Sequence, residues 1–251
     1  MRKLVILGSS NAIPDGRHEN THMALVSDER FILIDCPGNP VVRLQKAGLE
    51  LEQLSDLILT HFHPDHVSGV ALLLLDLWLL GRKRLLRISG LAETLNKLEK
   101  MMEMYGWDDW PGFFPVQLNR LPEEEMTFVL EDSEWRIVAS PVMHLIPNIG
   151  LRIESIQSGK VLAYSSDTQP CAQVVRLAHK ADVLIHESTG AARGHSDSSQ
   201  AAQVAREAGA SRLYLIHYPT GKFWDENILT RATEHFGGPV NLAEDFMEIQ
   251  F

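Results

Sequence analysis

The densest group of chemically active side chains is the segment THFHPDHVSG at 60–69, which holds three histidines and one aspartate within six positions. It begins directly after an apolar run that is typical of a strand. Imidazole nitrogen suits zinc, and alternating His61 and His63 on an extended turn can direct both rings at one ion. Asp65 and His66, one step further on, can reach a second ion. The segment therefore predicts a metal site at the end of a strand.

Three more polar residues stand behind strand-like runs and can join that site. His144 and His217 each follow an apolar run, and Asp167 lies in an SSDT turn after the run at 161–164. A carboxylate or imidazole at a strand end can project beyond the sheet, where metal ligands are often placed.

The elements that must position these residues can be read from hydrophobic periodicity and turn signals. Strands are expected at 3–7, 31–35, 57–60, 135–140, 150–156, 161–165, 181–186 and 212–216, and helices at 40–48, 70–80 and 197–209. Ser196 or Asp197 is the expected N-cap of the last helix. Because strands and helices mix throughout, the class is α/β or α+β.

The length of 251 residues and a hydrophobic content of 45% favour one domain over residues 1–251. The apolar run that opens the chain is too short for a secretory segment and is expected to be the first strand of a cytoplasmic protein. The run at 70–80 falls short of the roughly 20 residues that cross a membrane, so no membrane partner is expected. Cys36 and Cys171 lack the spacing of a cysteine zinc site.

The net charge of −10 argues against a long nucleic-acid duplex as partner, because lysine and arginine supply most non-specific affinity for phosphates. Bound divalent cations would still add local positive charge. Residues 101–125, rich in methionine, aromatic residues and then glutamate, are the one compositional anomaly. They either pack against the body or form a substrate lid or an oligomer contact, as in a homodimer. In the lid interpretation Trp107, Trp110 and Phe113 form a wall over the metals.

The chain resembles the metallo-β-lactamase superfamily, whose motif of histidine, any residue, histidine, any residue, aspartate, histidine is complete at 61–66. It resembles ribonuclease Z and its relatives more narrowly. That resemblance is carried by LGSSNAIP at 7–14, PVMH at 141–144 with Pro147 and Gly150, SDT at 166–168, HEST at 186–189, GHS at 194–196 and IH at 216–217. The implied fold is α+β, a four-layered αββα sandwich of two mixed sheets flanked by helices.

The resemblance also implies a ligand set for two divalent metal ions, with zinc expected and manganese or iron also acceptable to such ligands. One ion would be held by His61, His63 and His144, the other by Asp65, His66 and His217, with Asp167 bridging both. Two zinc-type ions indicate hydrolysis, because they lower the pKa of a bridging water to about 7. Asp65 would orient that water or take its proton.

The proton for the leaving oxygen is assigned by the resemblance to His195, oriented by Glu187. Ser188 and Asp197 stand where this family usually has alanine and threonine, but the carboxylate and imidazole themselves are retained. His186 is expected to support a metal ligand from outside. The remaining histidines carry no motif and are expected to be solvated: 18, 22, 179 and 235.

Two departures from ribonuclease Z affect the expected substrate. Only 22 residues separate His144 from Asp167, too few for the long arm that grips transfer RNA, and DCPGNP at 35–40 replaces a glycine-rich segment. The leading hypothesis is therefore a metal-dependent phosphodiesterase acting on a small or single-stranded phosphodiester. The alternatives are a hydrolase of an aryl sulfate, lactone or β-lactam, an endonuclease that processes transfer-RNA 3′ ends, and a metal site without catalysis.

Overall fold

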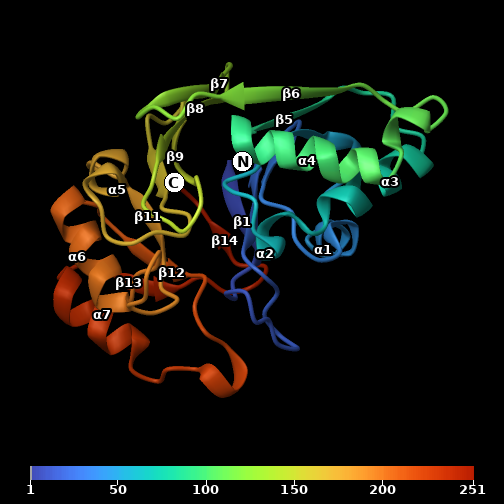
Figure 1. Ribbon diagram of the computed structural model, residues 1–251. Coiled ribbons are helices and arrows are strands. Elements are labelled where there is room, and N and C mark those ends of the chain that lie inside the picture. The colour runs from blue at the N-terminus through green and yellow to red at the C-terminus, as the bar shows by residue number, and fades with distance from the viewer. Residues whose placement is uncertain (1) are drawn as a thin grey trace.

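The computed structural model describes residues 2–251 and contains two seven-stranded sheets (Figure 1). Strands of the first sheet lie in the order β14, β1, β2, β3, β4, β5, β6. Their bounds are β14 Glu248–Ile249, β1 Lys3–Gly8, β2 His22–Val26, β3 Phe31–Ile34, β4 Leu54–Ile58, β5 Leu86–Leu91 and β6 Val116–Leu121. From β14 to β3 the pairing is antiparallel, and from β3 to β6 it is parallel.

The second sheet has the order β13, β12, β11, β10, β9, β8, β7. Its strands are β13 Val240–Leu242, β12 Leu213–Ile216, β11 Val183–Glu187, β10 Val161–Tyr164, β9 Ile149–Ser155, β8 Trp135–Pro141 and β7 Thr127–Glu131. From β7 to β10 the pairing is antiparallel, and from β10 to β13 it is parallel. The two sheets thus repeat one pattern, with the change of pairing at β3 in one and at β10 in the other.

Helices cover the outer face of each sheet (Figure 1). The first sheet carries α1 Pro40–Lys46, α3 Val70–Leu79 and α4 Ala92–Met104, with the short α2 Pro64–Val67 at its end. The second carries α5 Ala172–Leu177, α6 Ser198–Ala208 and α7 Ile228–Phe236. Three single-turn 3₁₀ helices complete the connections: η1 Leu51–Gln53, η2 Trp107–Asp109 and η3 Gly221–Phe223. Asp197 is the N-cap of α6 and forms a capping box with Gln200.

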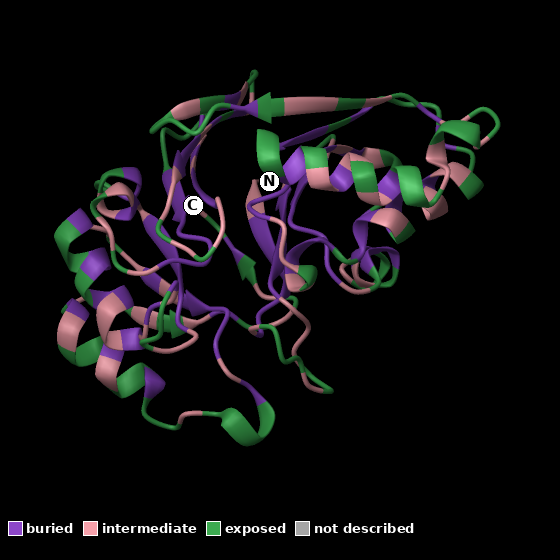
Figure 2. Ribbon diagram, viewed as in Figure 1, coloured by how far each residue is buried: buried purple, intermediate pink, exposed green. Residues whose placement is uncertain are grey.

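Three hydrophobic clusters hold these layers together. Alternation along β1 sends Leu4 and Ile6 into the cluster between the two sheets and Val5 and Leu7 into the cluster under α1, α3 and α4. A third cluster lies between the second sheet and α5, α6 and α7. The inner strands are accordingly largely buried on both faces, whereas the edge strands β6, β7, β13 and β14 are partly exposed (Figure 2). This arrangement confirms the expected four-layered αββα sandwich.

The edge formed by the carboxyl ends of the strands receives most of the chemically active residues. Asp35 follows β3, His61 lies three positions after β4, and Glu187 is the last residue of β11. Asp167 lies three positions after β10, and His217 comes directly after β12. Ligand sites in open α/β sheets form outside such carboxyl ends.

The aromatic segment within 101–125 lies at the opposite edge, so the expected wall over the metals is wrong. Helix α4 starts at the carboxyl end of β5 and runs back along the sheet, and the segment then enters β6, which is parallel to β5. There the Trp110 ring stacks on that of Trp78 in the last turn of α3, with 5.1 Å between ring centroids. Packing against the body is confirmed, while an oligomer contact by this segment stays a prediction.

Within residues 2–251, the helices are too short or too polar to cross a membrane. Gly69, the N-cap of α3, lies where a side chain does not fit. Its φ is not positive, but a Cβ there would lie 2.7 Å from the Pro37 carbonyl oxygen and 2.8 Å from that of Cys36. Glycine therefore lets the start of α3 approach the loop after β3.

Candidate metal centre

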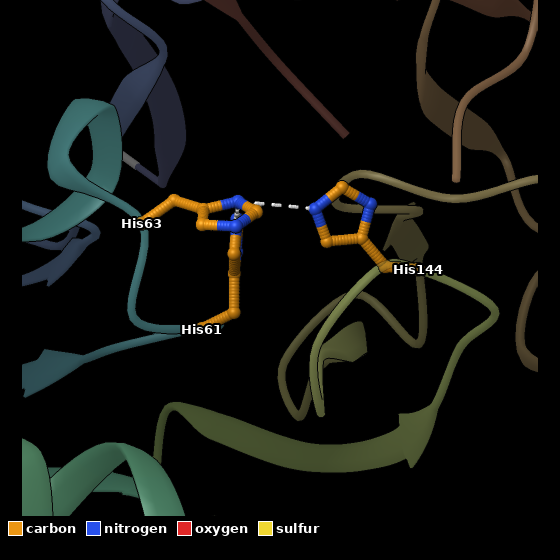
Figure 3. Close-up of side chains that lie close together, drawn as sticks. All are labelled: His61, His63 and His144. Atoms are coloured by element: carbon orange, nitrogen blue, oxygen red, sulfur yellow. Dashed lines mark hydrogen bonds between the residues drawn. The ribbon is translucent and has the colours of Figure 1, made fainter. Parts of the chain in front are cut away.

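His61, His63 and His144, named here the first ligand group, direct one nitrogen each at a common point (Figure 3). His63 Nδ1 lies 3.0 Å from His61 Nε2 and 3.2 Å from His144 Nε2. Three nitrogens that converge in this way, two from the segment between β4 and α2 and one from the loop after β8, match the ligand count of a zinc-type ion with an open position.

Asp65, His66 and His217 form the second ligand group, and one ligand atom from each lies within 4.8 Å of the others. Asp65 Oδ2 is 3.4 Å from His217 Nε2 and 3.6 Å from His66 Nε2. His66 is fully buried and His217 is 2% exposed. The group therefore combines two imidazoles and a carboxylate from the two sheets.

Asp167 stands between the two groups. Its Oδ2 lies 3.5 Å from His66 Nε2 and 3.6 Å from His217 Nε2, and it lies 3.9 Å from His61 Nε2 and 4.0 Å from His144 Nε2. One carboxylate oxygen thus faces nitrogens of both ligand groups, as a bridging ligand must.

The electrostatics of the cluster fit a pair of cations. Among the described residues, His66 Nε2 and Asp167 Oδ1 are buried without a hydrogen-bond partner, a costly arrangement unless a cation satisfies them. Burial lowers the pKa of His61 well below its usual range, and the nearby imidazole of His66 lowers it further. The low pKa keeps His61 neutral, with a lone pair available for a metal ion. Burial opposes protonation of His66 too, but the Asp167 and Asp35 carboxylates raise its pKa well above the usual value. A divalent cation would replace that proton.

The other ring nitrogen of most ligands is held by a partner that the sequence did not reveal. Asp35 Oδ2 lies 2.8 Å from His66 Nδ1 and accepts a hydrogen bond from the Thr60 hydroxyl, whose oxygen lies 3.0 Å from His61 Nδ1. The Thr189 hydroxyl is 2.7 Å from His217 Nδ1. On His144, Nδ1 lies 2.7 Å from the carbonyl oxygen of Gly194. Such partners fix ring orientation and tautomer, leaving the facing nitrogen for a metal.

Three residues at this edge adopt left-handed backbone conformations although none is glycine. The φ angles are +59° at Asp35, +53° at Ser166 and +54° at His217. Non-glycine residues with this conformation concentrate at functional sites, where the surrounding structure maintains them. Around Ser166, the Asn148 side chain accepts from its hydroxyl at 3.0 Å and donates to the Asp167 carbonyl oxygen at 2.7 Å.

His195 and Glu187 lie beside the ligand groups as a hydrogen-bonded pair, with 3.0 Å between Nδ1 and Oε1. The His195 ring centroid is 5.0 Å from that of His144 and 6.0 Å from that of His217. Glu187 is fully buried and also accepts from the backbone N–H groups of residues 168, 189 and 196. Burial opposes protonation of His195, but the hydrogen bond and charge of Glu187 raise its pKa above the usual value.

Two expectations about other histidines are wrong. His186 alternates with Glu187 along β11 and points away from the ligand groups, and its Nδ1 contacts the Glu187 carbonyl oxygen rather than a ligand. His22 is fully buried in β2 instead of solvated, and desolvation lowers its pKa to about 4. The spacing of histidines and aspartates along the sequence did not identify Asp35 and Thr60 as partners of the ligands. Their positions just after apolar strands were the one signal that could have done so.

The comparisons with known proteins agree with this geometry. A family model described as "Beta-lactamase superfamily domain" matches residues 30–218. Ribonuclease Z of Methanothermobacter thermautotrophicus is 27% identical in an alignment that covers all of this chain and 97% of that protein.

Solved structures show the same fold. The metallo-β-lactamase fold protein YhfI of Bacillus subtilis superimposes with a TM-score of 0.84 at 21% identity, covering 98% of both chains. The short form of human tRNase Z, ELAC1, has a TM-score of 0.80 at 23% identity, covering 99% of this chain and 98% of that one. The chain therefore belongs to the metallo-β-lactamase superfamily as a ribonuclease Z-like member, a metal-dependent hydrolase by its fold and its histidine and aspartate cluster.

Proposed function

We propose that the chain is a phosphodiesterase that uses two divalent metal ions, zinc first among the candidates, on a small or single-stranded phosphodiester. The first ligand group would hold one ion, the second ligand group the other, and Asp167 would bridge them. The bound ions would supply Lewis-acid chemistry, lowering the pKa of a coordinated water and polarising the attacked phosphoryl group.

The His195 and Glu187 pair is the observation that carries the proposal. Cleavage of a phosphodiester releases an alkoxide, which needs a proton at the moment the bond breaks. Glu187 holds His195 Nδ1 at 3.0 Å, so the imidazolium keeps its Nε2 proton free for that oxygen. The Glu187 carboxylate is in turn fixed by three backbone N–H groups, so the pair requires little rearrangement before the reaction.

Asp65 serves a second role besides ligation. Its side chain is 15% exposed, whereas that of Asp167 is 2% exposed, so Asp65 is the carboxylate of the cluster that water can reach. It is hydrogen-bonded to His217 at 3.4 Å, which keeps its position defined. In the proposed reaction Asp65 orients the attacking water and accepts its proton.

The preference for a small substrate rests on the short connection between β9 and β10. The two strands, of seven and four residues, occupy half of the 22-residue interval between His144 and Asp167, and the turn that joins them spans only residues 156–160. The alignment with the Methanothermobacter ribonuclease Z runs over 306 positions, 55 more than the 251 residues of this chain. A chain that lacks such insertions offers fewer remote contacts to a large folded RNA.

Processing of transfer-RNA 3′ ends is the second candidate, because the similarity to ribonuclease Z covers the whole chain. The same ligand groups and the same acid could cleave that phosphodiester. The two candidates differ in where binding energy comes from, and so in their kcat/KM ratio for small and large substrates.

A parallel substrate panel tests the proposal. Zinc-loaded protein would be assayed with bis-p-nitrophenyl phosphate, an aryl sulfate, a lactone, a β-lactam and a precursor transfer RNA, with a chelator-treated sample and His195→Ala as controls. We expect the highest kcat/KM on the small diester and loss of turnover after chelation. Faster turnover of the sulfate, lactone or β-lactam would contradict the proposed reaction class.

A further inference from the structure

We infer that Asp245, near the C-terminus, is a positioning residue that fixes the metal-ligating side chain of His217 through Ser9. The inference rests on the proposed function, because it assumes that His217 holds an ion. Asp245 contacts none of the ligand groups itself. It stands at the end of a chain of hydrogen bonds that leads to the backbone of His217.

The first link of this chain is a backbone hydrogen bond. His217 has the left-handed φ of +54°, and its N–H donates to the carbonyl oxygen of Ser9 at 2.8 Å. Ser9 is fully buried in the loop after β1. Because a positive φ is uncommon for a residue other than glycine, the direction of the ring depends on the partner that holds its backbone as well as on the Thr189 hydroxyl at its Nδ1. Movement of Ser9 would therefore move the His217 ring.

The second link fixes Ser9. Its hydroxyl donates to Asp245 Oδ1 at 2.8 Å, and the Tyr218 hydroxyl lies 3.3 Å from the same Ser9 oxygen. Tyr218 also donates to the Ala243 carbonyl oxygen at 2.8 Å. Tyr218, which follows the ligand His217, and Ser9, which accepts from the His217 N–H, are thus both hydrogen-bonded to the segment at 243–245.

The third link fixes Asp245. Its Oδ2 accepts from the Glu19 N–H at 2.9 Å and from the guanidinium of Arg43 in α1. Arg43 also donates to the Leu7 carbonyl oxygen and lies 4.2 Å over the Phe246 ring. The Asp245 side chain is 6% exposed and that of Arg43 14%, so solvent screens this ion pair little.

These contacts make one carboxylate the junction of the β1–β2 loop, α1 and the C-terminal segment that pairs with β1 (Figure 1). An asparagine there would offer one acceptor oxygen in place of two, so it could not hold the Ser9 hydroxyl and the donors of Glu19 and Arg43 together, and Arg43 would lose its ion-pair partner. Outer partners of metal ligands typically contribute about 10–100-fold to metal affinity. The second ion, held by His217, should therefore lose affinity, while the first ligand group keeps its own.

The test is a zinc titration of Asp245→Asn against a chromophoric chelator, which measures the dissociation constants of both ions. The matched control is Asp56→Asn, because Asp56 is also a buried carboxylate paired with arginines, at 3.2 Å from Arg30 and 2.7 Å from Arg87, but belongs to a separate network. We expect Asp245→Asn to weaken the second ion by about 10-fold or more and the first by less than threefold. Both constants should stay near wild type in the control.

Ser9→Ala provides the second variant, since it removes the hydroxyl link without unpairing Arg43, and it should weaken the same ion in the same direction. Turnover of both variants should recover at saturating zinc. Wild-type constants in Asp245→Asn and Ser9→Ala, or equal weakening of both ions, would overturn the inference while leaving the proposed function intact. A wild-type protein that binds fewer than two ions would instead contradict the proposed function.

Discussion

Asp35 and His66 form a fully buried pair in which Oδ2 of the carboxylate lies 2.8 Å from Nδ1 of the imidazole. The same carboxylate accepts from the hydroxyl of Thr60, which in turn contacts His61 Nδ1. A single side chain at the end of β3 therefore orients one imidazole from each ligand group.

Asp35→Asn should weaken both metal ions by about 10–100-fold. The backbone will not be the cause, because asparagine tolerates the φ of +59° found there as well as aspartate does. The substitution removes the negative charge that favours one tautomer of His66. It also removes one of the two oxygens that accept hydrogen bonds around Thr60. Equilibrium dialysis of variant and wild type against buffered zinc would measure the effect. Unchanged affinity for both ions would show that the ligands hold their orientation without Asp35.

Asp167→Ala should remove both metal ions, because its Oδ2 faces nitrogens of both ligand groups within 4.0 Å. Elemental analysis of metal-loaded wild-type protein should give two ions per chain, since the seven candidate ligands exceed what one tetrahedral zinc ion uses. The variant should give none and show no hydrolysis. Retention of one ion would mean that Asp167 belongs to a single ligand group.

His195→Ala should keep both ions and lower kcat by about 10²–10⁴-fold, the usual contribution of a general acid. His195 is hydrogen-bonded to Glu187 through Nδ1 and belongs to neither ligand group, so its loss should leave the metal content unchanged. A substrate with a p-nitrophenolate leaving group needs less protonation and should lose less rate. Loss of metal in this variant would identify His195 as a ligand.

Glu187→Gln should move the pH dependence of kcat. The general acid works only when protonated, so turnover falls as the pH rises through the pKa of His195, which Glu187 raises against the effect of burial. Removing the negative charge lowers that pKa, and the falling limb should shift to lower pH. A profile of kcat from pH 5 to 10 on a small diester would measure the shift. If the falling limb of the variant stayed at the wild-type pH, the titrating group would be one other than His195.

Much of this site was predictable because its signals are local. The alternation of His61 and His63 lies within one segment, and β10 is a short apolar run before a turn that contains Asp167. Asp35 was not predictable in the same way, because it is one of 33 acidic residues and meets His66 across 31 positions. Nothing local marks such a contact until the pairing of β3 with β4 brings the two together.

The prediction of where the aromatic segment lies was wrong for a related reason. Composition shows that Trp107 and Trp110 must be covered, but it does not show at which edge of the sheet. That follows from the direction of α4 and from the parallel pairing of β5 with β6, which the sequence pattern did not provide. Likewise, the pairing of β14 with β1 joins the two ends of the chain, and no periodicity indicates it.

Trp110→Ala should therefore destabilise the protein without affecting the reaction. Its ring stacks on Trp78 and meets Phe113 edge-on at 5.3 Å, far from the ligand edge. We expect the free energy of unfolding to fall by about 1–3 kcal/mol, below the cost for a fully buried ring because Trp110 is only half-buried. Denaturant titration measures this, and kcat/KM on a small diester should stay within twofold. A large fall in kcat/KM would instead indicate that the segment contributes to the reaction at the metal centre.

The short connection between β9 and β10 bears on the size of the substrate. The five-residue turn between β9 and β10 offers little surface for the remote contacts that offset the cost of aligning a large RNA, and the net charge of −10 adds no general affinity for phosphates. We expect kcat/KM on a small phosphodiester to equal or exceed that on precursor transfer RNA. Both constants must be measured at one zinc concentration and moderate salt, because low salt would inflate RNA binding. Asp167→Ala serves as the control for contaminating nuclease. Efficient, site-specific cleavage of the RNA with negligible turnover of small diesters would assign the chain to transfer-RNA processing instead.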